Sequence, residues 1–230
     1  MDSSINGSEP VSDIDPALWA DPAATYDKVA SAYAARFLHE LDHKPFDREI
    51  LTRFATATRR GSHEGHPVCD LGCGPGHIGA FLAAHGVNAQ GIDLSAGVVA
   101  QARLSHPNLS FSQGTMTALD LPDDTFTGIV CFYALIHVPR SQVSAALLEM
   151  SRLLVRGGAL LVAVHGGRGT LHADEMAGQP ADLDATLFSL VELCELIQRA
   201  GFAIVEVHER APYEVEHPTQ RLYVWATAGP

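Results

Sequence analysis

The sequence predicts a doubly wound α/β fold, in which helices cover both faces of a mostly parallel sheet of seven strands. Three observations predict it. Apolar, strand-like runs alternate with helical segments from residue 67 onward. The run TGIVCFYAL at 127–135 is almost entirely apolar, which is typical of a strand covered on both faces. The last two strand-like runs are joined by a connection too short for a crossover helix, so they are expected to form an antiparallel C-terminal hairpin.

Two helices are predicted ahead of the sheet. Apolar residues recur at three- and four-residue spacing from Ala24 to about Asp42, and a second helix is expected over Phe46–Thr58. We expect residues 24–62 to form a helical cap on a single domain that spans 24–230. Residues 1–23 are polar and acidic, and they are expected to be a disordered or loosely ordered tail.

The remaining elements follow in alternation. Ser95 is the expected N-cap of one helix, and the segment 166–186 has no clear period. Because that segment is too long for an ordinary connection, we expect it to be a lid insertion. Strands are predicted at 67–71, 88–94, 108–114, 127–135, 159–165, 203–211 and 220–228, and helices at 76–85, 96–105, 141–158 and 187–200.

Composition narrows the range of partners. The chain has 230 residues, of which 47% are hydrophobic, and a formal net charge of −12. An acidic surface repels phosphate backbones and anionic lipids, so we expect neither nucleic acid nor membrane as a partner. The start of the chain lacks the features of a secretory signal, and the four cysteines form no CxxC pair, which favours free thiols in the cytoplasm. His63 and His66 have no third ligand in view, so no metal site is expected.

The stretch VCDLGCGPGHIGAFL, residues 68–82, ends a strand at an acid and continues with four glycines. Gly74, Gly76 and Gly79 form a GxGxxG pattern, and Asp93 lies 19 residues after Gly74, which is the spacing of a dinucleotide-binding site. Two features argue against a dinucleotide. Asp70 would repel a pyrophosphate at the strand end, and the expected terminal hairpin replaces the usual sixth parallel strand. The sequence therefore favours a ligand that carries a positive charge.

These residues resemble a known family. DLGCGPG resembles motif I of the class I S-adenosylmethionine-dependent methyltransferases, GIDLS resembles their second motif, and LLVRGGALLVAV resembles the passage into their fifth strand. The early YDKVASAYAARF is similar to the N-terminal helix of members that act on small molecules. The resemblance implies a Rossmann-like fold, methyltransferase activity and S-adenosylmethionine as cofactor.

The resemblance also implies a set of cofactor contacts. Asp70 is expected to accept from the ammonium group, Asp93 from both ribose hydroxyls, and Leu94 to pack on the adenine. Many members have an acid at the position of Thr115, so this sequence departs from the pattern there. The expected cofactor-binding residues are Tyr26, Tyr33, Asp70, Gly72, Cys73, Gly74, Gly76, Asp93, Leu94, Thr115, Met116 and Tyr133.

Two histidines are expected at the edge of the sheet where ligands bind. His137 follows the fourth strand and His165 ends the fifth, so either is a candidate base that takes a proton from the acceptor, or a residue that positions it. Arg168, Asp184 and Glu214 are candidate substrate contacts in the lid and the hairpin loop. Alignment alone accelerates methyl transfer from a sulfonium, so the chemistry requires no further catalytic group.

The sequence thus predicts a methyltransferase that acts on a small molecule of the kind found in specialised metabolism. Two alternatives stay open. One is an NAD-dependent oxidoreductase, and the other is a methyltransferase-like protein that uses the bound cofactor without methyl transfer. The acceptor atom and the oligomeric state are also left open.

Overall fold

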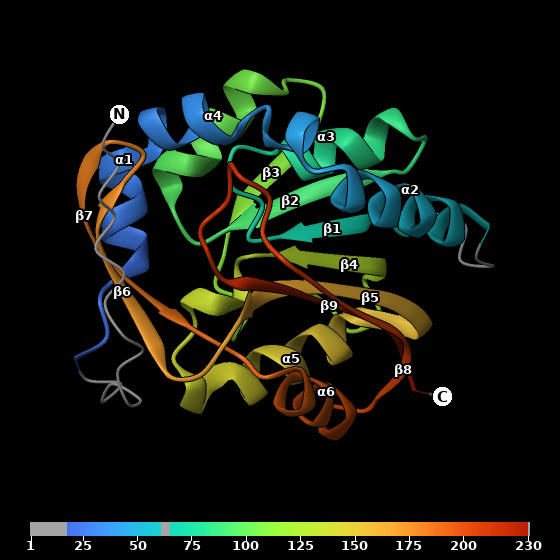
Figure 1. Ribbon diagram of the computed structural model, residues 1–230. Coiled ribbons are helices and arrows are strands. Elements are labelled where there is room, and N and C mark those ends of the chain that lie inside the picture. The colour runs from blue at the N-terminus through green and yellow to red at the C-terminus, as the bar shows by residue number, and fades with distance from the viewer. Residues whose placement is uncertain (1–17, 61–64, 230) are drawn as a thin grey trace.

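The computed structural model describes residues 18–60 and 65–229. Seven strands form one sheet in the order β3-β2-β1-β4-β5-β9-β8 (Figure 1). Strands β1 to β5 are parallel to one another, and β9 runs antiparallel to both β5 and β8. The predicted fold class is therefore confirmed, including the terminal antiparallel strands. The strands are β1 (Val68–Leu71), β2 (Ala89–Asp93), β3 (Ser110–Gln113), β4 (Phe126–Phe132), β5 (Leu154–Gly166), β8 (Phe202–Arg210) and β9 (Gln220–Ala228).

Helices cover both faces of this sheet, as Figure 1 shows. Helices α2 (Pro45–Arg60) and α3 (His77–Ala84) pack on one face, and α5 (Val143–Leu153) and α6 (Leu190–Arg199) pack on the other. Helix α4 (Ala96–Ser105) packs beside β2 and β3, and Ser95 caps it by accepting from the Val98 N–H. The β4 strand is buried at all seven positions, which explains its apolar sequence. None of the helices within the described residues is long and apolar enough to cross a membrane.

Helix α1 (Pro22–Phe37) crosses the carboxyl ends of the strands, and the short 3-10 turn η2 (Glu40–His43) joins it to α2. Helix α1 begins at Pro22, two residues before the expected Ala24, because Asp21 caps the helix and Pro22 occupies its first turn. The Asp27 carboxylate on α1 accepts from the Ser95 hydroxyl at 2.5 Å and from the Gly97 N–H at 2.8 Å. These bonds hold the helix against the start of α4. Residues 1–17 of the expected tail lie outside the described residues.

Three expectations about secondary structure differ from the structure. The helix expected from Ala24 to about Asp42 ends at Phe37, and η2 follows it as a separate 3-10 turn. The helix predicted over 141–158 ends at Leu153, since Leu154 already pairs with Phe126 as the start of β5. The aperiodic segment 166–186 is a two-stranded sheet of its own, made of β6 (Thr170–Met176) and β7 (Gln179–Thr186). This hairpin lies beside α1, at the same edge of the main sheet (Figure 1).

Candidate active site

A cavity of about 350 Å³ lies at the carboxyl edge of the sheet. Its volume falls in the range of small-molecule binding sites, and its position is the one where open α/β sheets bind ligands. The loops after β1 to β4 form its floor, and the N-terminal segment with α1 forms its cover. Residues from these elements that line it include Trp19, Asp21, Tyr26, Tyr33, Gly72, Gly74, Asp93, Leu94, Ser95, Thr115, Met116, Thr117, Tyr133, His137, Pro139 and Gln142.

The glycine loop leaves no room for side chains. Gly72 has φ +74°, and a Cβ added there would lie 2.1 Å from the Cβ of Ala134. Gly74 has φ +52°, and an added Cβ would lie 3.3 Å from the ring of Tyr33. Both conformations disfavour L side chains. A ligand in the cavity therefore meets bare backbone between the end of β1 and the cap helix.

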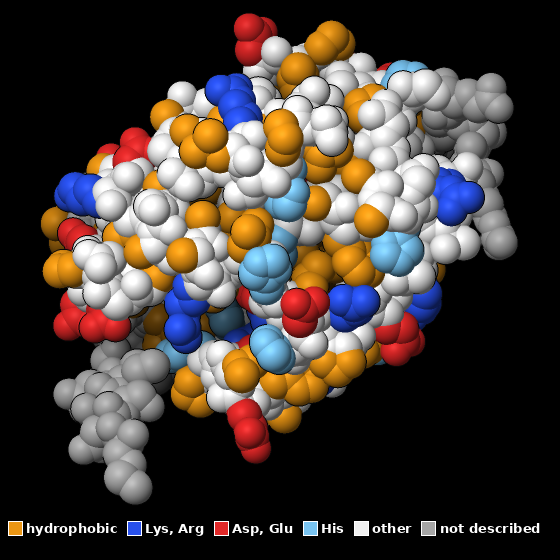
Figure 2. All heavy atoms as spheres, turned by 90° about the horizontal axis from the view of Figure 1, so that it is seen from above, with side chains coloured by type: hydrophobic (Ala, Val, Ile, Leu, Met, Phe, Trp, Pro, Cys, Tyr) orange, Lys and Arg blue, Asp and Glu red, His pale blue; other side chains and the backbone are white. Residues whose placement is uncertain are grey.

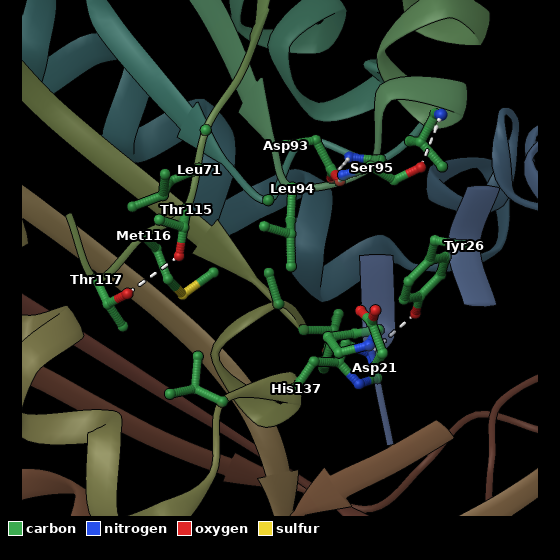
Figure 3. Close-up of a pocket in the computed structure, with 18 of the residues that line it drawn as sticks. Asp21, Tyr26, Leu71, Asp93, Leu94, Ser95, Thr115, Met116, Thr117 and His137 are labelled. Carbon is green, nitrogen blue, oxygen red and sulfur yellow. Dashed lines mark hydrogen bonds between the residues drawn. The ribbon is translucent and has the colours of Figure 1, made fainter. Parts of the chain in front are cut away.

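Asp93 ends β2 and is fixed by the backbone around it. Its Oδ2 accepts from the Gly74 N–H at 2.9 Å, and its Oδ1 accepts from the Ser95 N–H at 3.0 Å (Figure 3). Burial raises the pKa of this carboxyl, while the backbone N–H donors oppose the rise. A carboxylate oxygen has two lone pairs, so each oxygen can still accept from a ligand hydroxyl.

Asp70 lies beneath the glycine loop and outside the cavity lining. It is 1% exposed, and its Oδ2 accepts from the Gly79 N–H at 2.8 Å. Burial raises its pKa to about 7, His77 lowers it, and Asp93 adds to the rise. Two other expected cofactor residues, Cys73 and Gly76, are also buried outside the lining.

The wall that would face an adenine is formed by Leu94 and by residues 115–117 after β3. The hydroxyls of Thr115 and Thr117 lie 3.0 Å apart, and Met116 lies between them along the chain (Figure 3). Where the family resemblance led us to expect an acid, this wall therefore offers the neutral hydroxyls of Thr115 and Thr117. Sequence reasoning missed Thr117.

His137 lies in the cavity wall with both ring nitrogens engaged. Its Nδ1 is 3.0 Å from the carbonyl oxygen of Asp184, which only accepts, so Nδ1 carries the proton. Its Nε2 then accepts from the Tyr26 hydroxyl at 2.9 Å (Figure 3). Burial lowers the pKa of His137, and burial together with Asp93 raises that of Tyr26. The two side chains form a neutral pair that joins α1 to the 3-10 turn η3 (Leu135–His137).

His165 lies behind Tyr133, outside the lining of this cavity. Its Nδ1 is 2.7 Å from the Thr219 hydroxyl oxygen. Burial lowers its pKa well below the ordinary value, and Arg221 lowers it further. The structure thus places the two candidate bases in different surroundings and does not bring both to one cavity.

The three candidate substrate contacts also lie outside the lining. Asp184 is 3% exposed, and its carboxylate accepts from the Ala20 N–H at 2.9 Å and contacts His172 Nδ1 at 2.9 Å. It fastens the N-terminal segment to the β6–β7 hairpin. Arg168 and Glu214 are exposed. Sequence reasoning missed Trp19, Asp21 and Gln142, although a tryptophan followed by Asp-Pro, a typical helix start, was a readable signal.

The cavity lining is acidic. It contains the carboxylates of Asp21 and Asp93, and the described residues that line it include no lysine or arginine. A pyrophosphate would meet these carboxylates without a compensating cation, whereas a positively charged ligand is attracted to them. Within residues 18–60 and 65–229, no group of three or more His, Cys, Asp or Glu side chains is arranged to hold a metal ion. His63 lies outside the described residues, and His66 contacts the Thr125 carbonyl oxygen.

Taken together, this sheet, its glycine loop and its strand-end carboxylate define an α/β protein that binds a nucleoside-bearing, positively charged ligand. A family model described as a methyltransferase domain matches residues 68–158. The chain is 35% identical over 143 residues to the demethylmenaquinone methyltransferase of Beutenbergia cavernae, covering 62% of this chain and 57% of that protein. It is also 35% identical over 129 residues to the malonyl-[acyl-carrier protein] O-methyltransferase of Erwinia billingiae, covering 56% and 49%.

Among solved structures, the CcbJ methyltransferase from Streptomyces caelestis matches with a TM-score of 0.68 at 18% identity, over 92% of this chain and 100% of that one. This likeness shows the fold. The chain spans about half the length of the curated relatives it matches. The methyltransferase-domain match and these relatives support assignment of the chain to the class I S-adenosylmethionine-dependent methyltransferases.

S-adenosylmethionine is the cofactor of this family, and the described residues fit it. Asp93 offers carboxylate oxygens for a ribose diol, and the glycine loop leaves the backbone accessible. The lining holds carboxylates and, among the described residues, no cation that would repel a sulfonium. Nine of the twelve expected cofactor residues line the cavity, and the exceptions are Asp70, Cys73 and Gly76.

Proposed function

We propose that this protein transfers a methyl group from S-adenosylmethionine to a small-molecule acceptor within the cavity. The observation that carries the proposal is the acidic lining, with Asp93 fixed beside a bare glycine loop and no lysine or arginine among the described lining residues. That lining is unfavourable to the alternative of a nicotinamide dinucleotide. On the face seen in Figure 2, Lys and Arg side chains are scattered among acidic and apolar ones, which supports a small acceptor over a nucleic acid.

S-adenosylmethionine supplies an electrophilic methyl group when bound. The protein then has to hold the acceptor in line and exclude water, and such alignment provides much of the acceleration. We infer that His137 is a positioning residue, because its Nε2 is occupied by Tyr26 and its Nδ1 by the Asp184 carbonyl. Burial disfavours protonation of His137, so it is a poor base while this pair is intact. His165 does not line the cavity, and a role as base would require it to move.

We propose that residues 24–230 work as one methyltransferase domain, with a helical cap at 24–62 and a lid at 166–186. Contacts between cap and lid support this view. The Thr25 hydroxyl donates to the Asp182 carbonyl at 2.6 Å, and the Ala20 N–H donates to Asp184. These bonds join the N-terminal segment and α1 to the hairpin, so the two elements are expected to move together. The free cysteines Cys69, Cys73, Cys131 and Cys194 favour action in the reducing cytoplasm.

The test uses S-adenosylmethionine with a labelled methyl group and a metabolite extract separated by size from protein and nucleic acid. We expect label to pass to a small molecule and S-adenosylhomocysteine to accumulate in step with it. Asp93→Ala is the control, since it should reduce both signals at an S-adenosylmethionine concentration that does not saturate the wild type. Label in the protein or nucleic-acid fraction would contradict a small-molecule acceptor. Binding of S-adenosylhomocysteine without transfer to any fraction would favour a protein that uses the cofactor as a scaffold.

A further inference from the structure

The N-terminal segment Trp19–Pro22 forms a wall of the cavity, and two of its polar groups are not explained by the cofactor. Figure 3 shows Asp21 beside His137 and Tyr26, away from Asp93 and Ser95. The residues that fit the cofactor come instead from the strand ends. This wall is therefore the part of the cavity that faces a second ligand.

Trp19 presents an unused hydrogen-bond donor. Its indole nitrogen is covered and has no hydrogen-bond partner among the described residues, and Trp19 is one of the residues that line the cavity. Buried donors in native proteins nearly always have partners, because burying one without a partner costs free energy. An indole N–H can only donate, so the missing partner is an atom with a lone pair. A bound ligand can supply it from within the cavity.

Trp19 is held in place by its neighbours. The adjacent Ala20 N–H donates to the buried Asp184 carboxylate at 2.9 Å, and Asp21 caps α1 by accepting from the Ala23 and Ala24 N–H groups. The backbone that follows Trp19 is thus held to the hairpin and to the start of α1. A donor carried on a fixed backbone discriminates between ligands better than one on a free loop, since less freedom is lost on binding.

The charge of this wall indicates what kind of acceptor it takes. Tyr26 and His137 satisfy each other as a neutral pair, so Asp21 is the charged group of the wall. Asp21 uses Oδ1 for the helix cap, which leaves Oδ2 for a ligand. No lysine or arginine among the described lining residues balances it. A carboxylate or phosphate on the acceptor would be repelled here, and a protonated amine would be attracted.

We propose that Trp19 and Asp21 bind the methyl acceptor and select an amine-bearing small molecule. An oxygen or nitrogen lone pair of the acceptor accepts from the Trp19 indole N–H, and a protonated amine, separate from the atom that is methylated, lies beside Asp21. Acceptors that carry a carboxylate or a phosphate at this end are excluded. The inference rests on the proposed function, because it assumes that the cofactor occupies the strand-end side of the cavity.

The test needs no knowledge of the natural acceptor. It uses S-adenosylhomocysteine and three analogues whose sulfur carries a carboxymethyl, a carbamoylmethyl or an aminoethyl group. The cofactor portion anchors each probe, and the added group extends toward the acceptor wall. Affinities are measured by calorimetry for the wild type, Trp19→Phe and Asp21→Asn. Both substitutions are conservative, since phenylalanine keeps an aromatic ring and asparagine keeps the helix cap. Glu195→Gln is the control, as Glu195 pairs with Arg199 on the exposed side of α6.

We expect the wild type to bind the aminoethyl analogue at least about tenfold more tightly than the carboxymethyl analogue, because the amine forms a charge-assisted hydrogen bond with Asp21 whereas the carboxylate is repelled. Asp21→Asn should reduce this preference to about threefold or less. Trp19→Phe should lower the affinity for the carbamoylmethyl analogue about five- to tenfold and leave the affinity for S-adenosylhomocysteine unchanged. In the wild type, the indole ¹H–¹⁵N signal of Trp19, one of two tryptophans, should move with the carbamoylmethyl analogue and not with S-adenosylhomocysteine.

Equal affinities for the three analogues, or preferences that neither substitution changes, would overturn the inference. Weaker binding of S-adenosylhomocysteine to Trp19→Phe would also overturn it, because the indole N–H would then serve the cofactor. If S-adenosylhomocysteine fails to bind the wild type at all, it is the proposed function that fails, and the two failures are therefore distinguishable.

Discussion

The Tyr26–His137 hydrogen bond joins the cap helix to the loop after β4. Removing the His137 side chain should destabilise the protein more than removing the Tyr26 hydroxyl. His137→Ala leaves two buried groups without a partner, the Tyr26 hydroxyl and the Asp184 carbonyl. At about 1–3 kcal/mol for each buried group left unsatisfied, the expected loss is about 2–6 kcal/mol. Tyr26→Phe leaves only the Nε2 of His137 without a partner, so its expected cost is about 1–3 kcal/mol.

The double variant separates this bond from the other effects of each substitution. With both side chains replaced, only the Asp184 carbonyl is left without its partner, so the double variant should lose less than the sum of the two single losses by the cost of two unsatisfied groups, about 2–6 kcal/mol. Urea unfolding of the four proteins without ligand measures this coupling. Losses that add to within about 0.5 kcal/mol would refute the reasoning, because independent sites behave in that way.

Three further predictions concern protonation and the glycine loop. Burial raises the pKa of Asp70 to about 7, above its unfolded value of about 3.9, so its contribution to stability should be lost as pH rises from about 4 to about 7, by up to about 1.4 kcal/mol per pH unit; urea unfolding should show this loss in the wild type and not in Asp70→Asn, and the same pH dependence in both proteins would contradict it. Burial lowers the pKa of His165 in the folded protein below its unfolded value of about 6.5. The contribution of neutral His165 to the free energy of unfolding is therefore complete above about pH 6.5, and below that pH it falls by up to about 1.4 kcal/mol per pH unit. In urea unfolding, the wild type should therefore lose its stability advantage over His165→Gln as pH falls from about 7 to about 5. An advantage that grows over this range would mean that folding raises the pKa of His165 and would contradict the prediction. Gly72→Ala places a Cβ 2.1 Å from the Cβ of Ala134 at a residue with left-handed φ. Thermal unfolding should therefore show that the free energy of unfolding falls by more than about 2 kcal/mol. A near-native melting temperature would mean instead that the loop changes conformation to accommodate the methyl group.

The order of the main elements was predictable because local signals and packing agree there. The apolar β4 strand, the Ser95 cap and the glycine loop each match the structure. The end of α5 was not predictable from the same signals. Leu154 and Val155 are apolar and buried, a pattern that suits a helix end as well as a strand start, and pairing with Phe126 decides the outcome.

The β6–β7 hairpin escaped prediction for a local reason. Its turn is Ala177–Gly178, with φ values of 53° and 75°, and Met176 pairs with Gln179 across it. Two successive residues with positive φ are typical of the tight hairpin turns that favour Asn-Gly or Asp-Gly. Alanine at the first position hides that signal. The two strands, TLHADEM and QPADLDAT, contain few large apolar residues, so they show no clear apolar alternation.

The cofactor side of the site was largely readable from the sequence, because a short contiguous motif and one strand end build it. The acceptor side was not. Tyr26 and His137 are 111 residues apart, and nothing in the sequence pairs them. Asp184 was expected to contact substrate, yet it is buried in bonds to Ala20 and His172. Only tertiary structure brings these groups together.

The central claim is that the cavity binds S-adenosylmethionine through Asp93, and calorimetry with two competing cofactor types tests it most directly. S-adenosylhomocysteine and NADH are titrated separately into the wild type and into Asp93→Ala. The account predicts that S-adenosylhomocysteine binds the wild type, that NADH does not, and that Asp93→Ala weakens binding by about 1–3 kcal/mol through lost charge-assisted hydrogen bonds. Tighter binding of NADH than of S-adenosylhomocysteine, or an affinity that Asp93→Ala leaves unchanged, would contradict it.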